Sequence, residues 1–89
     1  MAKVVFTRNL ARHVDCPEAE APGATVREVL SFLFQQNPRL GGYVLDERGA
    51  LRRHMTIFVD GRQLGDRAGL SDAVGPESEI YVMQALSGG

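Results

Sequence analysis

The sequence predicts an α+β roll, in which one main helix packs on one face of a mixed sheet and the elements follow the order β-β-α-β-β-β. Three observations lead to this prediction. Residues 25–36 have the apolar spacing of a helix, several short stretches alternate between apolar and polar residues, and Asp60-Gly61 is a strong signal for a two-residue hairpin turn. Because one helix covers only one face of a sheet, we expect the other face to meet water.

The first stretch with a strand pattern is residues 3–8, where Val4 and Phe6 point to one face and are expected to meet the core. Residues 13–20 predict a second, weaker strand. Pro17 would confine that strand to a sheet edge or end it, because proline cannot donate to the ladder. Together the two stretches predict an N-terminal hairpin.

The helix has the clearest pattern in the chain. Thr25 lies three residues before Glu28, which is the spacing of a capping box at a helix start. Pro38 is expected to end the helix, because the residue before a proline avoids the α region. The apolar residues at helical spacing are Val26, Val29, Leu30 and Leu33.

The segment after the helix, residues 39–52, is predicted to be irregular. Gly41-Gly42 and residues 47–49 are typical of turns. Its apolar side chains are expected to tuck beneath the fold: Leu40, Tyr43, Val44 and Leu45.

The last part of the chain returns to strands. Residues 55–59 predict a third strand and residues 62–65 a short fourth one. Residues 70–74 predict a single helical turn, and residues 78–85 a final strand. Since alternate residues of this final strand need the core, we expect it inside the sheet, beside the first strand and parallel to it.

Composition restricts the possible functions. The chain has 89 residues, of which 44% are hydrophobic and 24% charged, and these values predict one ordinary globular domain. A net charge of −1 does not favour nucleic acid or an anionic membrane as a partner. The start has no signal-peptide pattern and the sequence has no apolar run long enough to span a bilayer, so we expect a cytoplasmic protein. The lone Cys16 excludes an internal disulfide and a cysteine-ligated metal site, and no metal site is expected.

One group of residues points to a partner. Phe58 lies on the outward side of the predicted third strand, and Tyr81 and Met83 lie on the outward side of the last one. If those strands are close, the three side chains form an exposed apolar patch of the kind that marks a partner surface. The alternatives are that residues 39–52 cover them, or that they are scattered surface residues.

The chain ends directly after this patch. We expect residues 1–84 to form the domain and residues 85–89 a flexible tail ending in Gly88 and Gly89. Two glycines have no Cβ atoms, so they keep a tail narrow and mobile, and such a tail could present a free carboxylate. A frayed, unselected chain end would look the same.

These residues resemble a known family, the ubiquitin-like β-grasp sulfur carriers. The resemblance lies in "TIFVDGRQL", in "LSDAVGPESEIYVMQALSGG" and in the position of the diglycine after the last strand, and it extends over nearly the whole chain. The family includes the small subunit of molybdopterin synthase, the thiamine-pathway carrier and a carrier that serves a cysteine synthase. The longer stretch "GGYVLDERGALRRHM" is most similar to the last type.

The resemblance implies a β-grasp fold and a chemistry for the tail. The Gly89 carboxylate would attack the α-phosphate of ATP on an E1-like adenylyltransferase, and a persulfide or sulfide would convert the acyl-adenylate into a thiocarboxylate. Gly88 would let the tail pass a narrow channel, in which Leu86 and Ser87 would position it. The thiocarboxylate would then supply sulfur to a biosynthetic enzyme of the cysteine, molybdopterin or thiamine type.

The same resemblance gives the domain a passive role. Phe58, Tyr81 and Met83 would dock it on the partner enzymes, and the chain itself would bind no cofactor and contribute no catalytic residue. It would therefore not be an enzyme, and the ATP would belong to the adenylyltransferase. Two alternatives stay open: a ubiquitin-like modifier joined to lysines of target proteins, and an interaction domain with this fold and an idle tail.

Overall fold

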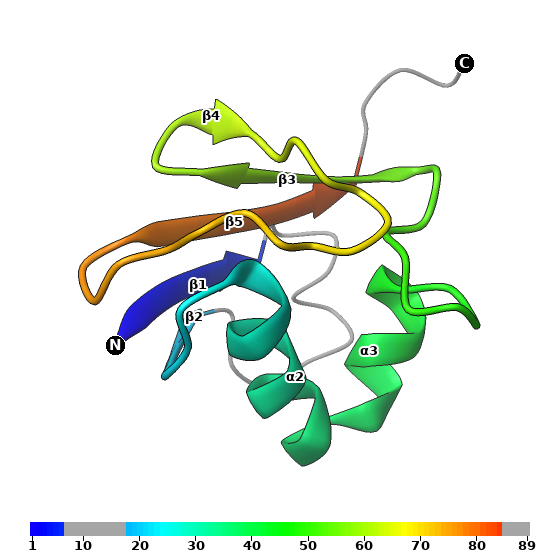
Figure 1. Ribbon diagram of the computed structural model, residues 1–89. Helices are drawn as coiled ribbons and strands as arrows, with labels where there is room; N and C mark the ends of the chain where they lie inside the picture. The colour runs from blue at the N-terminus through cyan, green and yellow to red at the C-terminus, as the bar shows by residue number, and fades with distance from the viewer. Residues whose placement is uncertain (7–17, 85–89) are drawn as a thin grey trace.

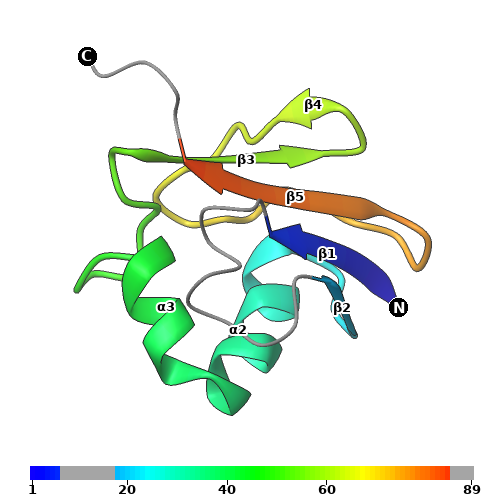
Figure 2. The same cartoon turned by 180° about the vertical axis from the view of Figure 1, so that it is seen from behind.

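The computed structural model describes residues 1–6 and 18–84. One sheet lies across two helices, which both pack on the same face of it (Figures 1 and 2). This arrangement is a β-grasp fold, so the predicted fold class is confirmed, with a second helix added to the one predicted.

The sheet has five strands: β1 (Ala2–Phe6), β2 (Glu18–Ala21), β3 (Met55–Val59), β4 (Arg62–Gln63) and β5 (Glu79–Gln84). Their order across the sheet is β2-β1-β5-β3-β4. The last strand runs parallel to β1, as the sequence predicts, and its other edge pairs antiparallel with β3.

The core lies between the sheet and helix α2 (Val26–Gln36). Alternate residues of the three central strands point into it, and the apolar stripe of α2 covers them. Each fully buried side chain of this kind contributes about 1.5–3 kcal/mol. The fully buried side chains of the core include Val4, Val26, Val29, Leu30, Ile57, Ile80 and Val82.

The start of α2 is capped as the sequence predicts. The Thr25 hydroxyl accepts a hydrogen bond from the Glu28 backbone N–H at 3.2 Å. The Glu28 carboxylate reaches back to the N–H of Ala24 at 3.1 Å, one residue earlier than in a standard capping box. The prediction of helix 25–36 is confirmed.

The prediction of an irregular segment at 39–52 is wrong in its first half, where a second helix forms, α3 (Pro38–Val44). Pro38 takes the first helical position, where its missing N–H costs nothing. The Asn37 side chain caps this helix by accepting from the N–H of Leu40 at 3.3 Å. Gly41 packs against Phe34 of α2, where a Cβ atom would lie only 3.1 Å from the ring.

The apolar side chains of this segment are divided between core and surface. Leu40 and Val44 are buried and Leu45 packs against the core, as predicted. Tyr43 is 39% exposed, so its predicted burial is wrong.

The predicted helical turn at residues 70–74 is also wrong. This segment runs along the start of α2 without helical structure and pairs with its backbone, and Leu70 has a φ of +55°. Leu70 O accepts from Arg27 N at 2.9 Å, and Asp72 O accepts from Val26 N at 3.0 Å. These bonds satisfy N–H groups that a helix start leaves free, and they replace the intrahelical bonds of a separate turn.

The strands differ from the prediction at their ends. β4 has two residues where the sequence predicts four, at 62–65, because Leu64 already turns into the core. Parts of the strands predicted at 3–8, 13–20 and 78–85 fall outside the described residues.

Two arginines bind the loops to the body. Arg27 of α2 donates to the carbonyls of Gly69 at 2.6 Å, Gly49 at 2.9 Å and Ala68 at 3.2 Å. Its planar guanidinium can serve several carbonyls at once, which a lysine cannot do with the same geometry.

Arg67 has the same role beside β3. It donates to the carbonyls of Arg52 and Met55, both at 2.8 Å. It thereby holds the start of β3, where β4 no longer covers the strand edge, and this start lies beside Gln84 at the end of β5.

Candidate functional site

The outer face of the sheet, which points away from the helices, brings the predicted docking residues together. Phe58 of β3 lies directly opposite Tyr81 of β5, and Met83 lies two residues further along β5, opposite Thr56. Tyr81 is 38% exposed, and Phe58 and Met83 are half-buried. Neither helix covers this face (Figures 1 and 2).

Val5 is a further member of this group, and its place there does not follow from the sequence alone. It is half-buried, and the parallel pairing of β1 with β5 places it beside Tyr81. Alternation in residues 3–8 puts Val5 on the outward side, but only the strand order identifies its neighbour. We call Val5, Phe58, Tyr81 and Met83 the outer apolar cluster.

Charged residues border the outer apolar cluster on the β2 side. Glu18 lies beside Val5, and Lys3 lies between Glu20 and Glu79. Lys3 Nζ is 3.2 Å from Glu18 Oε1, and this hydrogen bond together with the attraction of the carboxylate raises the pKa of Lys3.

Tyr81 of the outer apolar cluster forms a hydrogen bond with one of these charged residues, Glu79. Its hydroxyl donates to Glu79 Oε2 at 3.4 Å, a long hydrogen bond. Tyr81 therefore presents an apolar ring to solvent while its polar end is directed toward the carboxylates, a combination that suits a protein contact.

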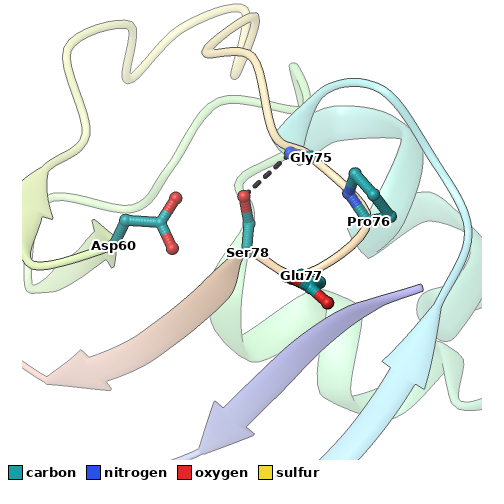
Figure 3. A pocket seen from close by; sticks show the side chains of 5 residues that line it. All are labelled: Asp60, Gly75, Pro76, Glu77 and Ser78. Carbon is teal, nitrogen blue, oxygen red and sulfur yellow. Dashed lines mark hydrogen bonds between the residues drawn. The ribbon is translucent and has the colours of Figure 1, made fainter.

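A polar hollow of about 310 Å³ lies where β5 begins, between the β3–β4 turn and the turn before β5 (Figure 3). Asp60 accepts from the Glu79 backbone N–H at 2.9 Å, and the Ser78 hydroxyl accepts from Gly75 N at 2.8 Å. The pKa of Asp60 is lowered by the bond from Glu79 and by Ser78. These hydrogen bonds hold the β3–β4 turn and the turn before β5 in place.

A metal site is not found in the described part of the chain, where no three His, Cys, Asp or Glu side chains gather in a way that could hold an ion. None of the helices in residues 1–6 and 18–84 has the length and apolar character needed to cross a membrane.

Several aspartates stabilise the fold through their charged form, which predicts a loss of stability in acid. Asp66 is an example: the Ser71 hydroxyl and the Gly69 N–H donate to it and lower its pKa below 3.8. The pKa of Asp46 and of Asp60 is lowered in the same way, chiefly by backbone N–H groups. A lowered folded-state pKa gives stability that is present above 3.8 and lost as the pH falls through the folded value.

We therefore expect the free energy of unfolding in urea to be level from pH 7 to about pH 5 and to fall below pH 4. Asp66→Asn should reduce the slope of this fall, because one of the titrating groups is removed. Equal slopes in the variant and the natural chain would contradict the assignment to Asp66.

The predicted tail residues Leu86, Ser87, Gly88 and Gly89 lie outside the described residues. The structure places the point from which they continue: Gln84 ends β5 opposite Met55, at the end of the sheet away from Lys3 and Glu79. Five extended residues span at most about 17 Å, so the last carboxylate can reach well beyond the body.

Comparison with known proteins identifies a family. The model of the ThiS family matches residues 7–89, nearly the whole chain. A search of curated proteins gives no significant match.

Solved structures give the same fold. CysO in the BexX/CysO complex of Amycolatopsis orientalis superimposes with a TM-score of 0.84 at 22% identity, with both chains covered completely. CysO of Mycobacterium tuberculosis gives 0.84 at 21% identity, covering 97% of this chain and 100% of that one. Small archaeal modifier protein 1 of Methanosarcina acetivorans gives 0.81 at 26% identity, covering 99% of this chain and 95% of the other.

Proposed function

Since the chain belongs to the ThiS family of ubiquitin-like β-grasp sulfur carriers, we propose that it transports sulfur as a thiocarboxylate on Gly89. The observation that supports this most is the position of the outer apolar cluster. Two of its members, Tyr81 and Met83, lie on the strand that leads into the diglycine tail. A partner that binds this face therefore receives the tail in a fixed direction.

The proposed reaction begins with ATP on an E1-like adenylyltransferase. A Gly89 carboxylate oxygen attacks the α-phosphorus and pyrophosphate leaves, which produces an acyl-adenylate. Sulfide then attacks the carbonyl carbon and AMP leaves, so that sulfur replaces one oxygen. With a persulfide as donor, the first product is an acyl disulfide, which a thiol reduces to the thiocarboxylate.

In this proposal the chain docks on the partner enzyme and positions its own tail, and it contributes no catalytic residue. The outer apolar cluster docks the body, Leu86 and Ser87 position the tail, and Gly88 and Gly89 pass the channel without a Cβ atom. The adenylyltransferase supplies the ATP site, and a biosynthetic enzyme of the cysteine, molybdopterin or thiamine type accepts the sulfur. We place this ATP-dependent chemistry in the cytoplasm.

A second function, protein modification, is favoured by the similarity to small archaeal modifier protein 1. The same acyl-adenylate would then react with a target lysine amine in place of sulfide. Both functions require Gly89, and a cell can use both.

The test is the intact mass of the protein after incubation with ATP, sulfide and an adenylyltransferase from the same cell. We expect a gain equal to the exchange of one oxygen for sulfur. Deletion of Gly89 should abolish the gain without changing the thermal unfolding of the domain. A gain that survives the deletion would show that sulfur enters elsewhere, and no gain in the natural chain would overturn the proposal.

A further inference from the structure

The exposed charges around the outer apolar cluster are arranged by sign along the strands. At the end of the sheet where β5 begins, Lys3 lies between Glu20 and Glu79 and forms an ion pair with Glu18, one pleat further along β2. Glu77, in the turn before β5, adds a fourth exposed carboxylate to this part of the molecule. Asp60 in the nearby β3–β4 turn and Arg62 at the start of β4 have opposite charges and offset each other. This end is therefore acidic.

At the end where the tail leaves, the described residues add one exposed positive charge, that of Arg53, because the charge of Arg52 is offset by Asp46. Arg52 and Arg53 precede β3, whose first residue, Met55, lies opposite Gln84. Arg52 is half-buried and donates its Nε–H to Gly42 O at 2.9 Å, which fixes its side chain to α3. Arg53 is exposed, and its guanidinium makes no hydrogen bond or ion pair with any residue that the structure describes.

The two ends are well separated. Glu79 and Gln84 lie five residues apart on β5, which corresponds to roughly 17 Å. At 0.1 M ionic strength the Debye length is about 10 Å, so a partner can sense the two ends separately. The outer apolar cluster lies between them, and the net charge of the whole chain is only −1.

From this arrangement, and resting on the proposed function, we propose that the charge polarity of the outer face orients the chain on its adenylyltransferase, with the tail toward the nucleotide site. The complementary enzyme surface has acidic residues around the mouth of the tail channel. It has basic residues at the opposite end of the surface that contacts the outer apolar cluster. Arg53 meets the acidic rim, and Glu20 and Glu79 meet the basic end.

The chemistry of a carrier favours this mode of recognition. A carrier must leave the adenylyltransferase after each turnover in order to reach its acceptor. Charges at the rim of an interface mainly raise the association rate, by 10- to 1000-fold in strongly steered cases, and have less effect on dissociation. If apolar contact alone provided the specificity, the contact would have to be tighter, and the carrier would then leave the adenylyltransferase more slowly.

The experiment uses charge reversals in the full chain. Glu20→Lys at the acidic end and Arg53→Glu at the tail end each change an exposed residue. The double variant Glu20→Lys/Arg53→Glu restores the net charge of −1 but reverses the polarity. The matched controls are Glu47→Lys and Arg48→Glu, exposed residues of the turn that follows α3 on the helix side of the sheet (Figure 2).

The measured quantity is kcat/KM for ATP-dependent thiocarboxylate formation at 20 mM and 500 mM salt, with thermal unfolding as a check of the fold. We expect each single reversal to lower kcat/KM about tenfold at low salt, and the double reversal to lower it more. All three losses should shrink below about twofold at high salt, and the controls should stay within twofold throughout.

A double variant that behaves like the natural chain would mean that only net charge matters, and would overturn the inference. Losses that persist at high salt would overturn it too, since they indicate lost packing. In both cases the natural chain still acquires sulfur, so the proposed function stands. Only a natural chain that never gains the sulfur mass at either salt concentration contradicts that function.

Discussion

Tyr81→Asp is expected to lower kcat/KM for thiocarboxylate formation about 100-fold, which corresponds to about 2.8 kcal/mol. Tyr81 is the central member of the outer apolar cluster, between Val5 and Phe58, and it is 38% exposed. Tyrosines at the centre of an interface commonly contribute 2 kcal/mol or more, and an aspartate there would also have to lose its hydration without a partner. The measurement is the initial rate of mass conversion as a function of carrier concentration.

The chain offers a matched control for this variant. Tyr43 is 39% exposed and belongs to α3, a helix that lies on the opposite side of the sheet from the outer face (Figure 1). Tyr43→Asp makes the same chemical change at the same exposure and should leave kcat/KM within twofold. Equal losses in Tyr81→Asp and Tyr43→Asp would contradict the assignment of the docking surface to the outer face.

Gly23→Ala is expected to destabilise the domain by about 3 kcal/mol. Gly23 connects β2 to the cap of α2 with a φ of +152°, which L-residues rarely adopt. A Cβ atom there would lie 2.8 Å from the backbone nitrogen of Val29 and 2.9 Å from the Glu28 Cβ. Both atoms belong to the first turns of α2, so the clash would move the helix that covers the core. Denaturant unfolding measures the loss.

Two other glycines distinguish the cost of a positive φ from the cost of a steric clash. Gly61 in the β3–β4 turn has a φ of +84° but open space around it, so Gly61→Ala should cost only about 1 kcal/mol. Gly42 lies inside α3, again in open space, and Gly42→Ala should stabilise the domain by up to about 1 kcal/mol. If Gly23→Ala costs no more than Gly61→Ala, close packing against α2 is not the reason for a glycine at this position.

The sequence predicts the elements whose signals are local. The stripe and cap of α2 depend on residues within one helix, and the alternation of β3 and β5 depends on neighbours two positions apart. The position of β5 beside β1 also follows, because its buried residues require a central place in the sheet. These signals were sufficient for the fold class.

The errors occur where distant contacts override local signals. Pro38 and the glycines at 41 and 42 are typical of a break, yet a proline fits the first position of α3 and Gly41 permits close contact with Phe34. Residues 70–74 have the sequence pattern of a helical turn, but the carbonyls of Leu70 and Asp72 accept hydrogen bonds from the free N–H groups at the start of α2 instead. Neither contact can be inferred from nearby residues.

The residues of the candidate site also fall into two groups, those that local signals predict and those that depend on contacts between distant parts of the chain. Phe58, Tyr81 and Met83 could be placed on one face from alternation alone. Val5 could be added only once the register of β1 against β5 was known. The separation of charge also depends on strand order, because Glu20, Glu79 and Arg53 are far apart in the sequence.

The central claim, that Gly89 is the site of sulfur attachment, is tested most directly by the intact mass of the protein purified from its own cells. We expect a population heavier by the exchange of one oxygen for sulfur, with the change located at Gly89 by fragmentation and absent when Gly89 is deleted. A chain found only with an unmodified carboxylate, in cells that contain its adenylyltransferase and a sulfur source, would contradict it.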